Sequence, residues 1–177
     1  MLNYSVAELR DIQNYCNDGV RRRDRLLDAG RAAELLRTGE YAVLSMVENR
    51  GGTPAGYGIP VSFVWDGGAS VYIHCAPEGH KLGCLDASPG ATLCVVGATR
   101  VVPRGFTTEY ESVLLRGTVS RGLGEGERME ALRMIVGKYS PGHEEVGMRY
   151  AAASFHRTEV LRFTIESASG KCKRVAP

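Results

Sequence analysis

The chain has 177 residues, 44% of them hydrophobic and 24% charged, which is typical of a globular protein with one core. The balance of 22 Lys and Arg against 20 Asp and Glu leaves a net charge of +2, which argues against nucleic acid as the main partner. Apolar runs fall short of the ~18 residues that a membrane span needs, and the first residues lack an apolar signal core, so we expect a cytoplasmic protein.

The first residues are the least patterned part of the chain. We interpret residues 1–20 as a short helical arm with a weak apolar face, and residues 21–177 as a single domain. The basic run at residues 21–25, Arg-Arg-Arg-Asp-Arg, lies between the two regions. A run of this length is usually a solvated surface, and that is the interpretation that we prefer here.

A helix is predicted next, followed by strands. Asp28 is placed to cap a helix that continues to Arg37, and Gly39 is available as a left-handed cap after it. Pro60 cannot donate a ladder hydrogen bond, so its strand must be bulged or unpaired on one side there. Tight turns at residues 49–52 and 66–68 predict a three-stranded antiparallel meander, with strands at residues 41–47, 57–65 and 69–75.

The second half of the chain alternates helices and strands without repeats or a linker. Helices are predicted at residues 78–87, 127–139 and, more briefly, 148–155. Strands are predicted at residues 91–100, 110–121 and 158–166, and residues 167–177 are expected to be a tail. We therefore expect an α+β, mainly β domain, in which six antiparallel strands close into a barrel with flanking helices.

The stretch at residues 73–82, Ile-His-Cys-Ala-Pro-Glu-Gly-His-Lys-Leu, combines a strand end, a polar turn and a helix start. Backbone N–H groups at a helix N-terminus point outward and favour an anion. Lys81 adds a full positive charge there, and His80 adds a second donor. This pattern favours a phosphate as the ligand.

Cysteine and histidine give little sign of a metal or disulfide framework. The five cysteines are odd in number and form no Cys-x-x-Cys pair. His74 and Cys75 are adjacent on a strand candidate, so their side chains should point to opposite faces and fail to share a metal. We predict buried, unreactive thiols and no metal site.

The order of these elements resembles the FMN-binding split barrels related to pyridoxamine 5′-phosphate oxidase, and in particular their nitroimidazole-reductase branch. The resemblance covers roughly residues 20–172, and its most specific part is His-Cys-Ala-Pro-Glu-Gly-His-Lys-Leu at residues 74–82. It implies a homodimer with flavin sites at the subunit interface, FMN as cofactor with FAD as the alternative, and a small-molecule substrate. It implies neither nucleic acid nor a membrane as partner.

The resemblance also implies which residues form the flavin site. Lys81 would pair with the phosphate, with His80 assisting, and the ring would lie against the strand at residues 60–63. The partner subunit would contribute the start of the strand at residue 110. The cofactor-binding residues implied in this way are Pro60, Val61, Ser62, Phe63, His74, Cys75, Ala76, His80, Lys81, Tyr110, Ser112 and Val113. His74 is the candidate catalytic residue, with a hydrogen-bonded strand cap as the plainer interpretation.

The sequence departs from the oxidases at the phosphate loop. Pro-Glu-Gly-His-Lys replaces their Ser/Arg/Lys-rich loop and leaves Lys81 as its one permanent cation, so we do not assign pyridoxamine-phosphate oxidation. We expect instead a flavin-dependent oxidoreductase that reduces a small electrophile such as a nitroaromatic. A non-enzymatic flavin-binding sensor and a haem-handling split barrel are the alternatives, because a fold alone does not fix a function.

Overall fold

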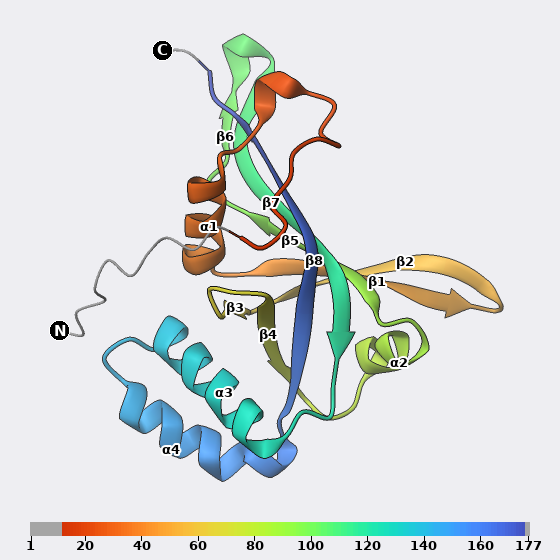
Figure 1. Ribbon diagram of the computed structural model, residues 1–177, viewed down its shortest axis with the longest axis vertical. Coiled ribbons are helices and arrows are strands. Elements are labelled where there is room, and N and C mark those ends of the chain that lie inside the picture. Colours follow the sequence, from red (N-terminus) through yellow and green to blue (C-terminus); the bar gives the residue numbers. More distant parts are fainter. Residues whose placement is uncertain (1–11, 176–177) are drawn as a thin grey trace.

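The computed structural model describes residues 12–175, which form an antiparallel sheet with helices around it (Figure 1). The strand order is β2-β1-β5-β7-β8-β4-β3, and β6 pairs with β7 outside this path. This α+β, mainly antiparallel fold agrees with the predicted split barrel, with eight strands in place of six. The strands are β1 (Ala42–Arg50), β2 (Thr53–Val61), β3 (Val64–Trp65), β4 (Ser70–Cys75), β5 (Gly90–Val96), β6 (Arg100–Val102), β7 (Thr107–Ser120) and β8 (Glu159–Lys173). The helices are α1 (Ala29–Thr38), α2 (His80–Ala87), α3 (Glu125–Tyr139) and α4 (Glu144–Ser154).

Helix α1 begins as the sequence predicts. The Asp28 carboxylate accepts a hydrogen bond of 2.8 Å from the Arg31 N–H and so caps the first turn. The predicted left-handed cap at Gly39 is wrong, because its φ of −60° is ordinary extended backbone. Glycine fits there for a steric reason, since a Cβ would lie 2.7 Å from a Val95 methyl and 2.8 Å from the Leu35 carbonyl oxygen.

Strands β1 and β2 form the predicted hairpin. Gly51 and Gly52 occupy its two-residue turn at φ values of 60° and 88°, which only glycine adopts readily. Pairing runs without a bulge from Arg50↔Thr53 to Ala42↔Val61. Because a two-residue turn closes on a hydrogen-bonded pair and the pairs then alternate, Pro60 falls in a non-bonded pair. Its nitrogen therefore faces the open edge of the sheet, and the prediction of one unpaired side is confirmed.

The predicted meander over residues 41–75 is wrong at its second step. The strand expected at residues 57–65 breaks at Ser62 and Phe63. Its first part is β2, which pairs with β1, whereas its second part is β3, which pairs with β4 at the opposite edge of the sheet. Strand β4 in turn pairs with β8. The sheet is therefore split between β2 and β3, and helix α2 packs near β1 (Figure 1).

Strand β8 extends well beyond its predicted end. The expected tail from residue 167 onward is strand as far as Lys173, paired with the first half of β7. Ala168 and Gly170 are buried in this part, and a Cβ on Gly170 would lie 2.3 Å from the Tyr15 hydroxyl. Burial at these small residues comes from residues 12–27, which pack beside β8, so the sequence of β8 alone does not reveal it.

The N-terminal arm also differs from the prediction where it is described. Residues 12–20 form turns, with a bridge from Tyr15 to Ala168 of β8, and no helix. Residues 1–11 of the predicted helical arm lie outside the described residues. Together with residues 100–112 and 167–175, residues 12–27 form what we call the upper lobe, which projects above the barrel in Figure 1.

The core lies between the sheet and helices α1 and α2. Alternate residues of β1, β5, β7 and β8 point inward, and the largest fully buried side chains include Phe63, Phe163, Leu36 and Leu44. Helices α3 and α4 pack on each other and cover the end of the sheet near β4. No helix within residues 12–175 is long and apolar enough to cross a membrane.

Candidate functional site

Helix α2 starts with backbone donors that have no partner. Gly79 precedes the helix at φ 134° and ψ 165°, a conformation that L side chains rarely adopt. No side chain caps the helix, and within the described residues the N–H groups of His80 and Lys81 have no acceptor. Two free donors at a helix N-terminus suit an anionic group.

Lys81 lies beside the end of β4, as the sequence predicts. The charge of its ammonium group acts on both the Cys75 thiol and the His74 imidazole. Desolvation, with the charge of Lys81 second, lowers the pKa of His74, so this imidazole is neutral at neutral pH. Burial raises the pKa of Cys75 despite Lys81, so the thiol stays protonated. Lys81 is thus the cation of this His74–Cys75–Lys81 cluster.

Arg121 is a nearby cation that sequence reasoning missed. It follows β7 and lies 2.9 Å from Asp86 and 3.7 Å from Glu159, which is opposite Cys75 in the ladder. The charge of Arg121 lowers the pKa of Cys75, but the larger effect of burial raises it. Only the strand order β7-β8-β4 brings it here, so spacing in the sequence gives no signal for it.

His80 faces a carboxylate in this structure. Its Nε2 lies 2.8 Å from Glu48 Oε2, and its ring meets the Tyr57 ring edge-on at 4.8 Å between centroids. Glu48 is buried, and its other oxygen lies 2.5 Å from Arg50, at an angle that does not make a hydrogen bond. The hydrogen bond from His80 is the main cause that lowers the pKa of Glu48. The predicted role of His80 toward a phosphate stays a prediction.

The segment from Pro60 to Phe63 is bound at Phe63 by side chains of helix α3. Pro60 and Ser62 are exposed, Val61 is partly buried, and Phe63 is fully buried. The Phe63 N–H donates to the Tyr139 hydroxyl at 2.8 Å, and the Phe63 carbonyl accepts from Lys138 Nζ at 2.9 Å. The Phe63 side chain therefore cannot reach a ligand on the surface, and its peptide is already bound.

Replacing Tyr139 with Phe should destabilise this segment. The Tyr139 hydroxyl accepts from the Phe63 N–H and also lies 2.8 Å from the Glu40 carbonyl oxygen. Without it the Phe63 N–H loses its partner, and we expect a loss of about 1–3 kcal/mol in the free energy of unfolding. Urea unfolding measures this loss. Tyr150→Phe, at a tyrosine that is 69% exposed, is the control, and an equal loss there would contradict the assigned contact.

The remaining predicted residues lie far from this cluster within one chain. Ser112 pairs with Lys171 of β8, whereas His74 pairs with Val160, eleven positions earlier on β8. That separation is about 35 Å along an extended strand. Tyr110 is partly buried in the upper lobe, and Val113 is fully buried in the core. Within one chain these residues therefore do not join the His74–Lys81 region.

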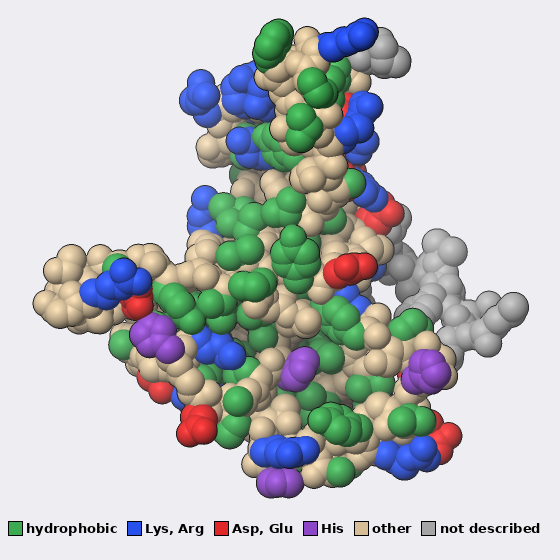
Figure 2. All heavy atoms as spheres, turned by 180° about the vertical axis from the view of Figure 1, so that it is seen from behind, with side chains coloured by type: hydrophobic (Ala, Val, Ile, Leu, Met, Phe, Trp, Pro, Cys, Tyr) green, Lys and Arg blue, Asp and Glu red, His purple; other side chains and the backbone are tan. Residues whose placement is uncertain are grey.

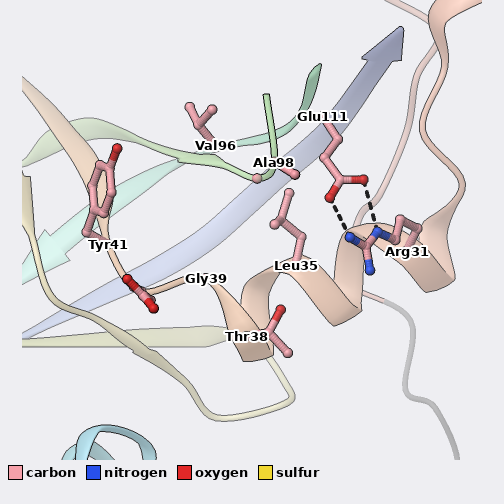
Figure 3. Close-up of a pocket in the computed structure, with 10 residues that line it drawn as sticks. Arg31, Leu35, Thr38, Gly39, Tyr41, Val96, Ala98 and Glu111 are labelled. Atoms are coloured by element: carbon pink, nitrogen blue, oxygen red, sulfur yellow. Dashed lines mark hydrogen bonds and ion pairs between the residues drawn. The ribbon is translucent and has the colours of Figure 1, made fainter. Parts of the chain in front are cut away.

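A separate pocket of about 270 Å³ lies beside α1 (Figure 3). Its wall includes the paired side chains of Arg31 and Glu111, and its floor includes Leu35 and Gly39. Arg31 donates to both oxygens of Glu111, at 3.0 Å and 2.5 Å. This carboxylate is already satisfied, and the pocket contains none of the predicted site residues. No group of three or more metal-ligating side chains is found in residues 12–175.

Comparison with known proteins supports the fold and its family. The model of the pyridoxamine 5′-phosphate oxidase family matches residues 28–172. None of the curated protein sequences matches this one. A candidate 5-nitroimidazole antibiotic resistance protein from Bacteroides thetaiotaomicron is 19% identical, with a TM-score of 0.64 over 84% of this chain and 86% of that one.

Two further structures of this fold belong to proteins whose names include a cofactor. The flavocytochrome Anf3 from Azotobacter vinelandii is 25% identical, with a TM-score of 0.68 over 85% of this chain and 69% of that one. An FAD- and haem-binding protein from Mycobacterium smegmatis is 21% identical, with a TM-score of 0.68 over 86% of this chain and 75% of that one. At these identities the likeness to the Bacteroides and Mycobacterium proteins shows the fold alone.

Proposed function

We propose, because the chain belongs to the pyridoxamine 5′-phosphate oxidase family, that it is a flavin-dependent oxidoreductase that reduces a small electrophile such as a nitroaromatic. FMN is the proposed cofactor. The observation that carries this proposal is the α2 N-terminus, where free N–H groups and the Lys81 ammonium lie together. That donor set fits the dianionic phosphate at one end of FMN.

When bound, the flavin supplies the electron transfer, and the protein supplies position and electrostatics. Lys81 and the N–H groups of α2 would hold the phosphate. The segment from Pro60 to Ser62, at the end of β2, would lie along the ring, with Tyr139 and Lys138 fixing the peptide that follows. Neutral His74 would offer either a donor or an acceptor beside the cofactor.

A homodimer completes this proposal. The residues at 110–113 lie about 35 Å from His74 along β8, so one subunit alone cannot bring the two groups to the same ligand. The outward face of the sheet offers an apolar surface to a second copy, since hydrophobic side chains gather across its centre in Figure 2. A dimer of this kind would place Ser112 of one subunit near Lys81 of the other.

Replacing Lys81 with Ala tests the phosphate assignment. We expect the variant to lose at least tenfold in FMN affinity, because a charge-assisted contact contributes about 1.5–3 kcal/mol. Riboflavin, which lacks the phosphate, should bind the variant and the native chain equally. Quenching of flavin fluorescence measures both affinities. Arg149→Ala, at an exposed position of α4 outside this cluster, is the matched control. Unchanged FMN affinity in Lys81→Ala would contradict the assignment of Lys81 to the phosphate.

The absorption spectrum of the purified protein separates the cofactor alternatives. Flavin bands support the proposal, whereas a Soret band without them would favour haem. Reduction of bound flavin by NADH or NADPH, followed by reoxidation with a nitroimidazole, distinguishes an oxidoreductase from a flavin-binding sensor. A flavin that stays oxidised with both donors would contradict the proposed activity.

A further inference from the structure

A buried glutamate lies on the core-facing side of β1. Ala42, Leu44 and Met46 share that side and are all buried, so the alternation of the strand predicts an apolar residue at position 48. Glu48 is instead 6% exposed, and its carboxylate faces the start of helix α2. A buried carboxylate loses its hydration, so a glutamate is unfavourable here unless its partners offset the loss.

The main partner of Glu48 is the first residue of α2. His80 Nε2 lies 2.8 Å from Glu48 Oε2. The hydrogen bond from His80 lowers the pKa of Glu48, so this carboxylate is charged at neutral pH and can only accept hydrogen bonds. His80 Nε2 therefore carries the proton and donates it to Glu48. The same N–H is then not available to a phosphate.

The imidazole of His80 is also contacted on other sides. Tyr57 of β2 meets it edge-on, with 4.8 Å between the ring centroids. Cys84, which is buried one turn later in α2, has its Sγ 3.6 Å from the same Nε2. Contacts with β1 and β2 thus fix the start of α2 against the β1–β2 hairpin.

These contacts leave the backbone donors of the α2 N-terminus open. A helix is commonly fixed at its start by a capping side chain, which occupies one of the first N–H groups. Gly79 has no side chain to do this, and within the described residues the N–H groups of His80 and Lys81 have no acceptor. The contact between His80 and Glu48 therefore holds the helix start in place of a cap and keeps both donors free.

We propose that Glu48 is a positioning residue for the cofactor phosphate, because it holds His80 and thereby aims the first N–H groups of α2 at that phosphate. This role rests on the proposed flavin function, in which Lys81 and these N–H groups bind FMN. It assigns His80 to the phosphate through its backbone N–H rather than through its imidazole.

Glu48→Leu tests this role, because it removes the acceptor and places an apolar side chain on the core face. We expect FMN to bind about tenfold more weakly, since the start of α2 must then be ordered on binding and ordering about one residue costs roughly this factor. Riboflavin, which lacks the phosphate, should bind as it does to the native chain. Quenching of flavin fluorescence measures both affinities. Glu48→Gln, which keeps an oxygen acceptor for His80, should retain most of the FMN affinity.

The direction of this change separates positioning from charge. Removal of a carboxylate near a dianion strengthens binding by electrostatics alone, and an imidazole released from Glu48 is free to turn toward the phosphate. FMN affinity that is unchanged or tighter in Glu48→Leu, while Lys81→Ala still weakens it, would therefore overturn the role of Glu48 alone. Glu145→Leu, which removes an equal charge from an exposed position of α4, is the matched control and should keep the native affinity.

Hydrogen exchange without flavin tests the anchoring of α2 independently. Glu48→Leu should speed amide exchange in α2, while exchange in α3 stays at the native rate. The thermal midpoint should stay at the native value or rise, because an apolar side chain replaces a buried charge. Native exchange in α2, or a lowered midpoint with equal losses of FMN and riboflavin affinity, would contradict a positioning role. A native chain that binds no FMN would contradict the proposed function instead, and exchange in α2 would still show whether Glu48 anchors the helix start.

Discussion

Gly117→Ala should lose about 3 kcal/mol or more in its free energy of unfolding. A Cβ at this position would lie 1.9 Å from the Thr164 carbonyl oxygen and 3.0 Å from the Phe163 ring. Both neighbours are held in β8, and the β7–β8 register shifts between Arg116 and Gly117, so the strands approach closely there. Neither a backbone carbonyl nor a buried ring can move away without breaking the ladder. Thermal unfolding should show a midpoint about 6–12 °C lower.

Gly137→Ala provides the control for this substitution. Gly137 is exposed in helix α3, and a Cβ there would meet no atom within 4 Å. Alanine is the better helix former, so this variant should be equally stable or more stable by roughly 0.5–1 kcal/mol. If Gly117→Ala unfolds at the native midpoint, the close approach of β7 and β8 at the register shift is wrong.

Glu111→Gln should remove about 2 kcal/mol from the free energy of unfolding at pH 7. Glu111 is 5% exposed and accepts both hydrogen bonds of the Arg31 fork shown in Figure 3. An amide leaves the guanidinium with a weaker partner inside the protein. The loss stays below the 3–5 kcal/mol of a fully buried pair, because the Arg31 side chain is 33% exposed.

The same variant should alter the response to acid. The hydrogen bonds from Arg31 hold the pKa of Glu111 below its ordinary value of 4.5. A lowered carboxyl pKa stabilises the fold fully above 4.5, and this contribution disappears as the pH falls through the folded-state value. Urea unfolding at pH 7 and pH 3 should therefore show the difference between the native chain and Glu111→Gln shrinking with acid. A constant difference would contradict the assigned pair.

Glu34→Gln is the internal control, since Glu34 contacts the same guanidinium at 2.7 Å from an exposed position. We expect a change below about 0.5 kcal/mol, as is usual for an exposed pair on a helix. The contrast between the two glutamates measures how much burial strengthens the contact with Arg31.

Local signals in the sequence predict the elements whose causes are also local. Asp28 identifies the start of α1, and the glycines at positions 51 and 52 identify the β1–β2 turn. Pairings between distant segments are harder to predict, because β4 and β8 are separated by more than eighty residues and their pairing depends on the whole sheet. The buried end of β8 was missed for the same reason, since Tyr15 and Leu27 create its environment.

The residues of the candidate site also differ in whether the sequence alone predicts them. His74, Cys75 and Lys81 are near in sequence, and the structure brings them together. Arg121 arrives beside them only through the strand order, so no local motif indicates it. The burial of Phe63 follows from its contacts with α3, more than seventy residues later.

The open edges of the sheet bear on aggregation. A free strand edge invites a second chain to add a strand, and proteins avoid this with short edge strands or prolines. Strand β3, at one edge, has two residues, and β2, at the other, carries Pro54 and Pro60. Both prolines fall in non-bonded pairs with β1, so the outer edge of β2 lacks a donor at each of these positions. Addition of a strand from a second copy at these two edges is therefore disfavoured.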